Sequence, residues 1–95
     1  MTLRIPAAST EYVHVPVTAD VVTSGFPVHI AIIPPGADPV SGDWKTAAWD
    51  GTEAVILVGP SQSITLASHS TYIVWVKVTA GIEIPVMRSG VLVTD

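Results

Sequence analysis

The chain has 95 residues, which is the size of one small domain, and 13% of them are charged while 48% are hydrophobic. Its formal net charge is −4, and the four cationic side chains are scattered along the sequence, so we expect no basic patch for nucleic acid (Arg4, Lys45, Lys77, Arg88). Cysteine is absent, which excludes disulfides and zinc–thiolate sites, and no apolar run is long enough for a signal peptide or a membrane span.

Short strands are predicted along the whole chain, because β-branched residues dominate between eight prolines and seven glycines. In chain order we expect strands at residues 12–18, 21–24 and 27–33, a long loop at 34–43, and strands at 44–49, 53–58, 63–66, 71–79 and 90–94. A short strand at 3–5 can precede them, and residues 83–87 are expected to be extended but interrupted by Pro85. Pro6 and Pro16 favour a sheet edge for the first strands, since proline cannot donate a ladder hydrogen bond. Seven to nine short strands predict a single all-β domain, residues 1–95, with an immunoglobulin-like antiparallel β-sandwich fold.

The strand at 71–79 carries the sharpest signal for this architecture. Its residues alternate strictly, which places Tyr72, Val74, Val76 and Val78 on one face. In immunoglobulin-type sandwiches, a tyrosine near the start of the sixth strand bonds back to the preceding corner, and a core residue follows two positions later. Tyr72 follows the polar corner at 68–70, so we predict that it is the structural corner and that its face points into the core.

The other face of this strand is unexpectedly apolar, because it carries Ile73 and Trp75. Trp44 and Trp49 are five residues apart in a short predicted strand, so one of them is expected to face away from the core. Tryptophan is a frequent anchor of protein interfaces, and a chain with so few charges has little interior in which to hide its apolar side chains. We therefore predict Trp75, Ile73 and Trp49 as interface residues. The alternative is that the loop at 34–43 folds over Trp75 or Trp49.

No pattern predicts catalysis or a cofactor. The three histidines, His14, His29 and His69, lie in different segments without a partner at metal-ligand spacing, so we interpret them as sheet-face or loop residues. The aspartates in and beside the long loop are interpreted as turn formers rather than calcium ligands. No G-x-S-x-G elbow or phosphate-binding loop is present. We expect no enzyme activity, no metal site and no cofactor.

Five segments occur in order in the last two thirds of the chain: P-V-H-I-A-I-I-P-P-G-A-D-P, D-W-K-T-A-A-W-D-G, A-V-I-L-V-G-P, T-Y-I-V-W-V-K-V-T and I-E-I-P-V-M-R-S-G-V-L-V. This run, residues 27–95, resembles the small immunoglobulin-like β-sandwich virion proteins of tailed bacteriophages, especially those of actinobacterial hosts. Such proteins are similar to collar and head–tail connection proteins. The most particular elements are W-x4-W-D-G, Y-x-V-W-V and E-x-P-V.

The resemblance implies a non-enzymatic structural subunit of the virion, at the head–tail connector, the collar or the capsid surface. The expected partners are other virion proteins, such as capsid, portal, connector or tail subunits, and further copies of the chain in a homo-oligomer. The protein would be made in the host cytoplasm, complete from Met1, and would bind neither nucleic acid nor membrane. Three alternatives remain open: a carbohydrate- or cell-surface-binding module on the virion, a small hydrolase, and a free-standing cytoplasmic β-sandwich.

Overall fold

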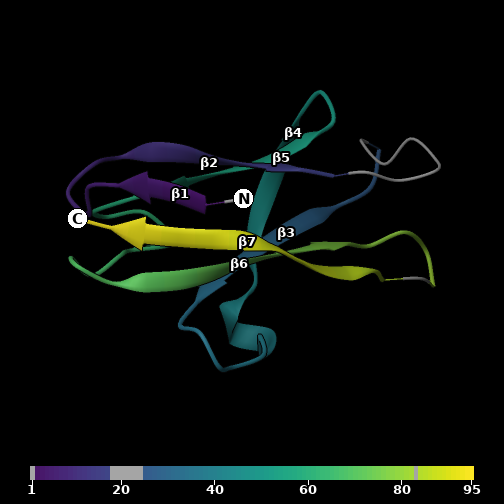
Figure 1. Ribbon diagram of the computed structural model, residues 1–95. Helices are drawn as coiled ribbons and strands as arrows, with labels where there is room; N and C mark the ends of the chain where they lie inside the picture. Colours follow the sequence, from purple (N-terminus) through teal and green to yellow (C-terminus); the bar gives the residue numbers. More distant parts are fainter. Residues whose placement is uncertain (1, 18–24, 83) are drawn as a thin grey trace.

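The computed structural model describes residues 2–17, 25–82 and 84–95 (Figure 1). These residues form seven strands and one short 3-10 turn, and no α-helix occurs among them. The elements are β1 (Thr2–Ile5), β2 (Glu11–Pro16), β3 (Val28–Ile33), η1 (Ser41–Asp43), β4 (Lys45–Asp50), β5 (Glu53–Val58), β6 (Thr71–Val78) and β7 (Val86–Thr94). Because there is no α-helix, no described segment is a helix that could cross a membrane. The prediction of an all-β fold is confirmed.

All seven strands belong to one sheet with the order β1-β7-β6-β3-β4-β5-β2. Strand β4 bends this sheet, because its first half pairs with β3 while its second half, from Ala48 to Asp50, pairs with β5. The β2–β5 part can therefore fold over the β3–β6–β7 part, and the sheet curls into a half-barrel with two facing layers (Figure 1). Strands β1 and β2 are the two edges, as Pro6 and Pro16 indicated.

One strand pair differs from the antiparallel prediction. β1 runs parallel to β7, with Thr2 opposite Val91 and Ile5 opposite Thr94, so the sheet is mixed. The pair is closed by a hydrogen bond from the Asp95 backbone N–H to the Ile5 carbonyl, 3.2 Å, and by an exposed ion pair between Arg4 and Asp95, 3.0 Å. Asp95 is thus tied to the end of β1.

The core lies between the two facing layers and consists of aliphatic side chains from six strands. Alternation places these side chains inward, as expected for strands with one buried face. The face of β6 that was predicted to point inward does so: Val74, Val76 and Val78 are at most 2% exposed, and Tyr72 packs partly against them. The other core residues are Ile5, Val13, Val15, Val28, Ile30, Ala54, Ile56, Val58, Ile64 and Leu92.

Tyr72 forms the corner that its position before the core valines indicated. Its hydroxyl oxygen accepts a hydrogen bond from the Ala67 backbone N–H at 2.9 Å. Thr94 supports the same corner from β7, because its buried hydroxyl accepts from the Ser70 N–H at 2.9 Å and donates to the Ala67 carbonyl. The corner therefore joins the beginning of β6 to the end of β7 through side-chain hydrogen bonds.

Four of the predicted extended segments differ from the structure or lie outside it. Residues 63–66 form no strand and contribute only a parallel bridge between Ile64 and Val58. The segments expected at 83–87 and 90–94 are one strand, β7, with a register irregularity opposite Val74 and Trp75. The strand expected at 21–24 lies outside the described residues.

Candidate functional site

Ile73 and Trp75 lie on the outer face of β6, as the alternation predicted, but this face is largely covered. Ile73 is 5% exposed and sits opposite Ile33, while Trp75 is half-buried opposite the fully buried Ala31. The indole Nε1 of Trp75 is itself buried and has no hydrogen-bond partner among the described residues. The expectation that Ile73 is open to solvent is therefore wrong, and the polar edge of the Trp75 ring is not accessible for bonding to a partner.

The segment after β3 explains part of this burial. The 3-10 turn η1 packs against β3, and Trp44 follows the turn directly. The Lys77 ammonium lies 4.7 Å from the centre of the Trp44 ring, on the same face of β6 as Trp75. Trp44 and the turn before it therefore lie beside this outer face, through contacts with Lys77 and with β3.

Trp49 packs against the core and is only partly exposed, at the edge of a surface hollow. Its Nε1–H donates a 2.8 Å hydrogen bond to the Phe26 carbonyl. The hydrogen bond satisfies the indole N–H, as is usual for a tryptophan that is mostly buried. The prediction of Trp49 as an outward-facing interface residue is therefore wrong, because β4 turns this face inward where it joins β5.

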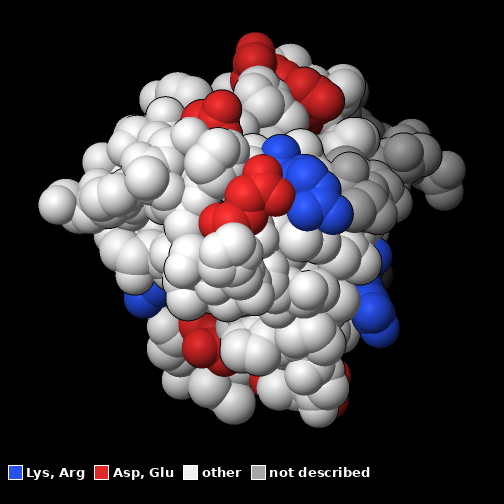
Figure 2. All heavy atoms as spheres, turned by 60° about the vertical axis from the view of Figure 1, so that its left-hand side comes forward, with Lys and Arg blue, Asp and Glu red and all other residues white. Residues whose placement is uncertain are grey.

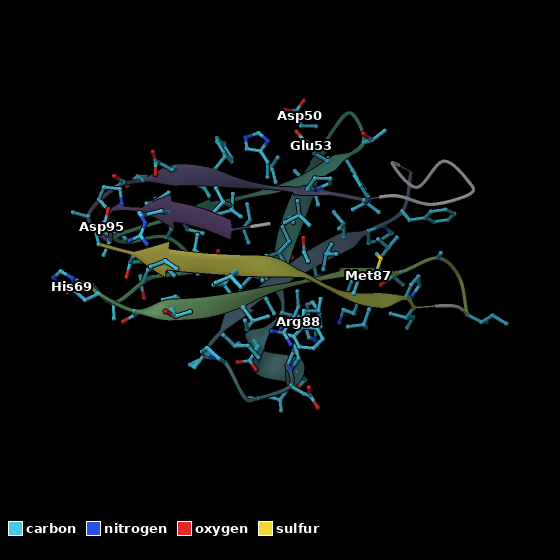
Figure 3. All side chains as sticks on the ribbon, in the orientation of Figure 1. Asp50, Glu53, His69, Met87, Arg88 and Asp95 are labelled. Carbon is cyan, nitrogen blue, oxygen red and sulfur yellow. The ribbon has the colours of Figure 1, made fainter. Side chains whose placement is uncertain are left out.

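Exposed apolar side chains gather instead at the connection between β6 and β7. Ile82 is 102% exposed, Ile84 52% and Val86 48%. Phe26, 38% exposed, lies at the same end, because the neighbouring Pro27 carbonyl accepts a hydrogen bond from the Thr79 N–H at the end of β6. We call these four residues the hairpin-tip patch. The connection projects to the right of the sheet in Figures 1 and 3, beyond Met87.

A second exposed feature lies on the outer face of the β2–β5–β4 layer. Tyr12 is 61% exposed and borders two adjoining hollows in this face. Both polar and apolar residues line these hollows. The lining residues other than Tyr12 are His14, Thr46, Ala47, Ala48, Trp49, Asp50, Val55, Ile56, Leu57, Gln62 and Ser63. The surface is thus a shallow groove with an exposed aromatic ring.

At one end of this groove, three side chains that are distant in the sequence come together. One nitrogen of His14 and one carboxylate oxygen each of Asp50 and Glu53 all lie within 4.8 Å of one another. Acidic side chains gather at the top of Figure 2, the level of the β4–β5 hairpin in Figure 1, and Figure 3 shows Asp50 beside Glu53. No local sequence spacing indicated this group, because its members come from different strands, while His14 itself lies on an outer sheet face as predicted.

The other two histidines do not join this group. His29 lies on the outer face of β3, and its Nδ1 is buried without a hydrogen-bond partner among the described residues. His69 is exposed at the corner before β6, with a φ of 52°, and lies at the left-hand end of the molecule in Figure 3, away from Asp50 and Glu53. Neither His29 nor His69 forms a salt bridge with a carboxylate among the described residues. The histidine and carboxylates that converge beside a hollow, as the hydrolase alternative requires, are His14, Asp50 and Glu53.

Comparison of the chain with models of protein families, with curated proteins and with solved structures found no match. The resemblance to phage virion proteins therefore remains a hypothesis about function. The surfaces that bear on it are the hairpin-tip patch, the groove beside Tyr12, and the cluster of His14, Asp50 and Glu53.

Proposed function

We propose that the protein is a structural subunit of a tailed-bacteriophage virion, at the head–tail connector, the collar or the capsid surface. In this role it binds other virion proteins and further copies of itself, and it catalyses no reaction. The observation that carries the proposal is the hairpin-tip patch, whose apolar side chains stand in solvent at a projecting end of the fold. This patch takes the place of the Trp75 face as the docking surface.

A neighbouring subunit that covers the patch removes its apolar side chains from water, which favours association. Burying an exposed isoleucine or valine side chain contributes about 1.5–3 kcal/mol. The sequence between Lys77 and Arg88 contains a single charged residue, Glu83, so covering the hairpin costs little desolvation of charge. A projecting apolar hairpin also fits the general anatomy of interfaces, in which a few well-packed apolar anchors supply most of the affinity.

Substitution of Ile82 tests the docking role. Ile82→Asp is expected to weaken self-association or incorporation into particles about 10–100-fold, because it replaces a buried apolar contact with a charge in the assembly. The thermal midpoint of the isolated domain should stay unchanged, since Ile82 is fully exposed. Sedimentation velocity of the full chain and co-purification with particles provide the two measurements.

A matched control is available in the loop before η1. Val40 is also apolar and 66% exposed, but it lies outside the patch, so Val40→Asp should assemble like the unsubstituted chain. Equal assembly of the Ile82→Asp chain and the unsubstituted chain would show that the patch is not the docking surface. A chain that remains monomeric at all concentrations and never enters particles would count against a structural subunit altogether.

The groove beside Tyr12 favours a second candidate, a carbohydrate- or cell-surface-binding module on the same virion. An exposed aromatic ring can stack on the apolar face of a sugar, and nearby Gln62, Ser63 and Thr46 can exchange hydrogen bonds with its hydroxyl groups. Concave surfaces with an aromatic lining and a few polar groups are the usual form of small-ligand sites.

Glycan binding by the free protein tests this candidate. Tyr12→Ala is expected to reduce binding on a glycan array at least about tenfold, because the ring supplies the apolar contact. Phe26→Ala, which removes an exposed ring outside the groove, is the control and should bind normally. Absence of glycan binding by the unsubstituted protein, or equal binding by the Tyr12→Ala chain, would leave assembly as the function.

A further inference from the structure

We propose that His14, Asp50 and Glu53 form a binding site for one divalent transition-metal ion of the Zn²⁺ type. This site goes beyond the proposed structural role, and it is independent of whether the protein assembles. No local sequence spacing indicates it, because its three side chains come from β2, the end of β4 and the beginning of β5.

The strand register brings the three side chains to one face. Glu53 pairs with Asp50 across the β4–β5 turn and with Pro16 across the β5–β2 ladder. His14 is two residues from Pro16, so its imidazole lies diagonally across from Glu53 on the same outer face. The three positions are thus fixed by two neighbouring ladders of one sheet.

The distances suit a shared ion. A tetrahedral zinc ion with bonds of about 2.0–2.2 Å holds its ligand atoms about 3.3 Å apart. The His14 Nδ1 atom lies 3.3 Å from the Glu53 Oε1 atom, and the Asp50 carboxylate falls within the same 4.8 Å limit. Small rotations of these side chains would bring all three ligand atoms to an ion, with water completing its coordination.

The backbone around the cluster is held by hydrogen bonds. The Val17 N–H donates to the Thr52 carbonyl at 3.2 Å, which ties the end of β2 to the β4–β5 turn. The turn itself uses Gly51 with a φ of +63°, a conformation that glycine adopts without a steric penalty. Little backbone ordering is therefore needed when an ion binds, and the side chains of His14 and Glu53, 47% and 43% exposed, leave the ion a path from solvent.

The charge balance favours a divalent cation. Two carboxylates face one imidazole, and no lysine or arginine of the described residues forms a salt bridge with either of them. A protonated His14 offsets one negative charge, whereas a divalent ion offsets both. An imidazole ligand with carboxylates suits zinc and its first-row neighbours, while calcium and magnesium prefer oxygen ligands alone.

The position beside the groove gives the site a second, independent feature. His14 and Asp50 line the same hollow as Tyr12, so the solvent side of the cluster is continuous with a concave surface. An ion bound by three protein groups keeps an open coordination position, as in the zinc sites that bind water or a further ligand. A molecule held in the groove could therefore reach the ion.

Isothermal titration of the full chain with Zn²⁺ tests the proposal. We expect one ion per chain, and at least about tenfold weaker binding for His14→Gln and for Asp50→Asn, because each removes one ligand. His69→Gln and Asp38→Asn are matched controls, since both residues are exposed and lie outside the cluster. The Zn²⁺ affinity of these two variants should stay within about twofold of that of the unsubstituted chain. A tenfold loss in the ligand variants is clearly distinguishable from such a small change.

Ring-nitrogen NMR signals of the three histidines give a readout that identifies the ligand. Addition of Zn²⁺ should shift the His14 signals and leave those of His29 and His69 in place, and circular dichroism should show that the variants fold. Three results would overturn the proposal: no saturable binding of Zn²⁺, an equal loss of affinity in His69→Gln, or equal shifts for all three histidines. Any of these would leave His14 and Glu53 as a simple surface ion pair.

Discussion

Ile30→Ala is expected to lower the free energy of unfolding by about 2–5 kcal/mol. Ile30 is 0% exposed and occupies the middle of the core, where it pairs with Val76 of β6 on one side and with Lys45 of β4 on the other. Its neighbours belong to hydrogen-bonded strands that can collapse only partly into the space left by the lost atoms. The variant therefore loses both the transfer free energy of those atoms and the packing around the cavity.

Urea denaturation followed by tryptophan fluorescence measures this loss, and the chain supplies a control with the same chemistry. Ile82→Ala removes identical atoms from a side chain that is 102% exposed, so its unfolding free energy should change by no more than about 0.5 kcal/mol. Small domains are stable by only about 5–15 kcal/mol, so the Ile30 variant should show a clearly lower midpoint. Equal effects of the two substitutions would contradict the placement of Ile30 in the core.

Gly59→Ala is expected to destabilise the domain by about 2–4 kcal/mol, through two separate causes. Gly59 follows β5 with a φ of +134°, a backbone conformation that residues with a Cβ rarely adopt. A Cβ at this position would also lie 2.5 Å from the Ser9 carbonyl oxygen and 2.9 Å from the Thr10 Cα, both in the connection between β1 and β2. Backbone on both sides of the contact has to shift to admit the methyl group.

Two other glycines separate these causes. Gly51 has a φ of +63° but open space around its Cβ position, so Gly51→Ala should cost only about 1–2 kcal/mol. Gly42 has neither a positive φ nor a neighbour within 4 Å, and Gly42→Ala should change stability by at most about 1 kcal/mol. Thermal unfolding should show the lowest midpoint for Gly59→Ala, a higher one for Gly51→Ala and the highest for Gly42→Ala. A Gly59 variant no less stable than the Gly51 variant would show that the approach of residues 9 and 10 carries no cost.

The strand pattern of β6 shows how far the sequence alone leads. Alternation is a local property, so the inward face of Val74 and Val76 and the corner at Tyr72 followed from the residues themselves. Whether Ile73 is exposed depends instead on what packs against the outer face, which no local pattern contains. Its burial against Ile33 requires the pairing of β6 with β3, and Trp44 reaches the same face through a loop.

Some features of the candidate sites likewise follow from local sequence patterns, whereas others depend on how the strands pair. The outward position of Tyr12 could have been inferred, because it alternates with the inward Val13, and an isoleucine directly after Gly81 in a turn is a signal of an exposed apolar group. The cluster of His14, Asp50 and Glu53 could not have been inferred from the sequence, because it depends on the register of β2 against β5. Sliding that register by one residue would turn His14 to the other face of the sheet.

The parallel pairing of β1 with β7 has a consequence for the order in which the molecule can assemble on the ribosome. Thr2–Ile5 are translated before the other six strands, yet their partners in the ladder, Val91–Thr94, come about ninety residues later. At roughly 5–20 residues per second, the backbone groups of β1 wait on the order of 5–18 seconds before their partners have been synthesised. The nascent chain therefore passes through a stage in which β2–β6 can already pair while β1 has no ladder partner, and the sheet is complete only once β7 has been made.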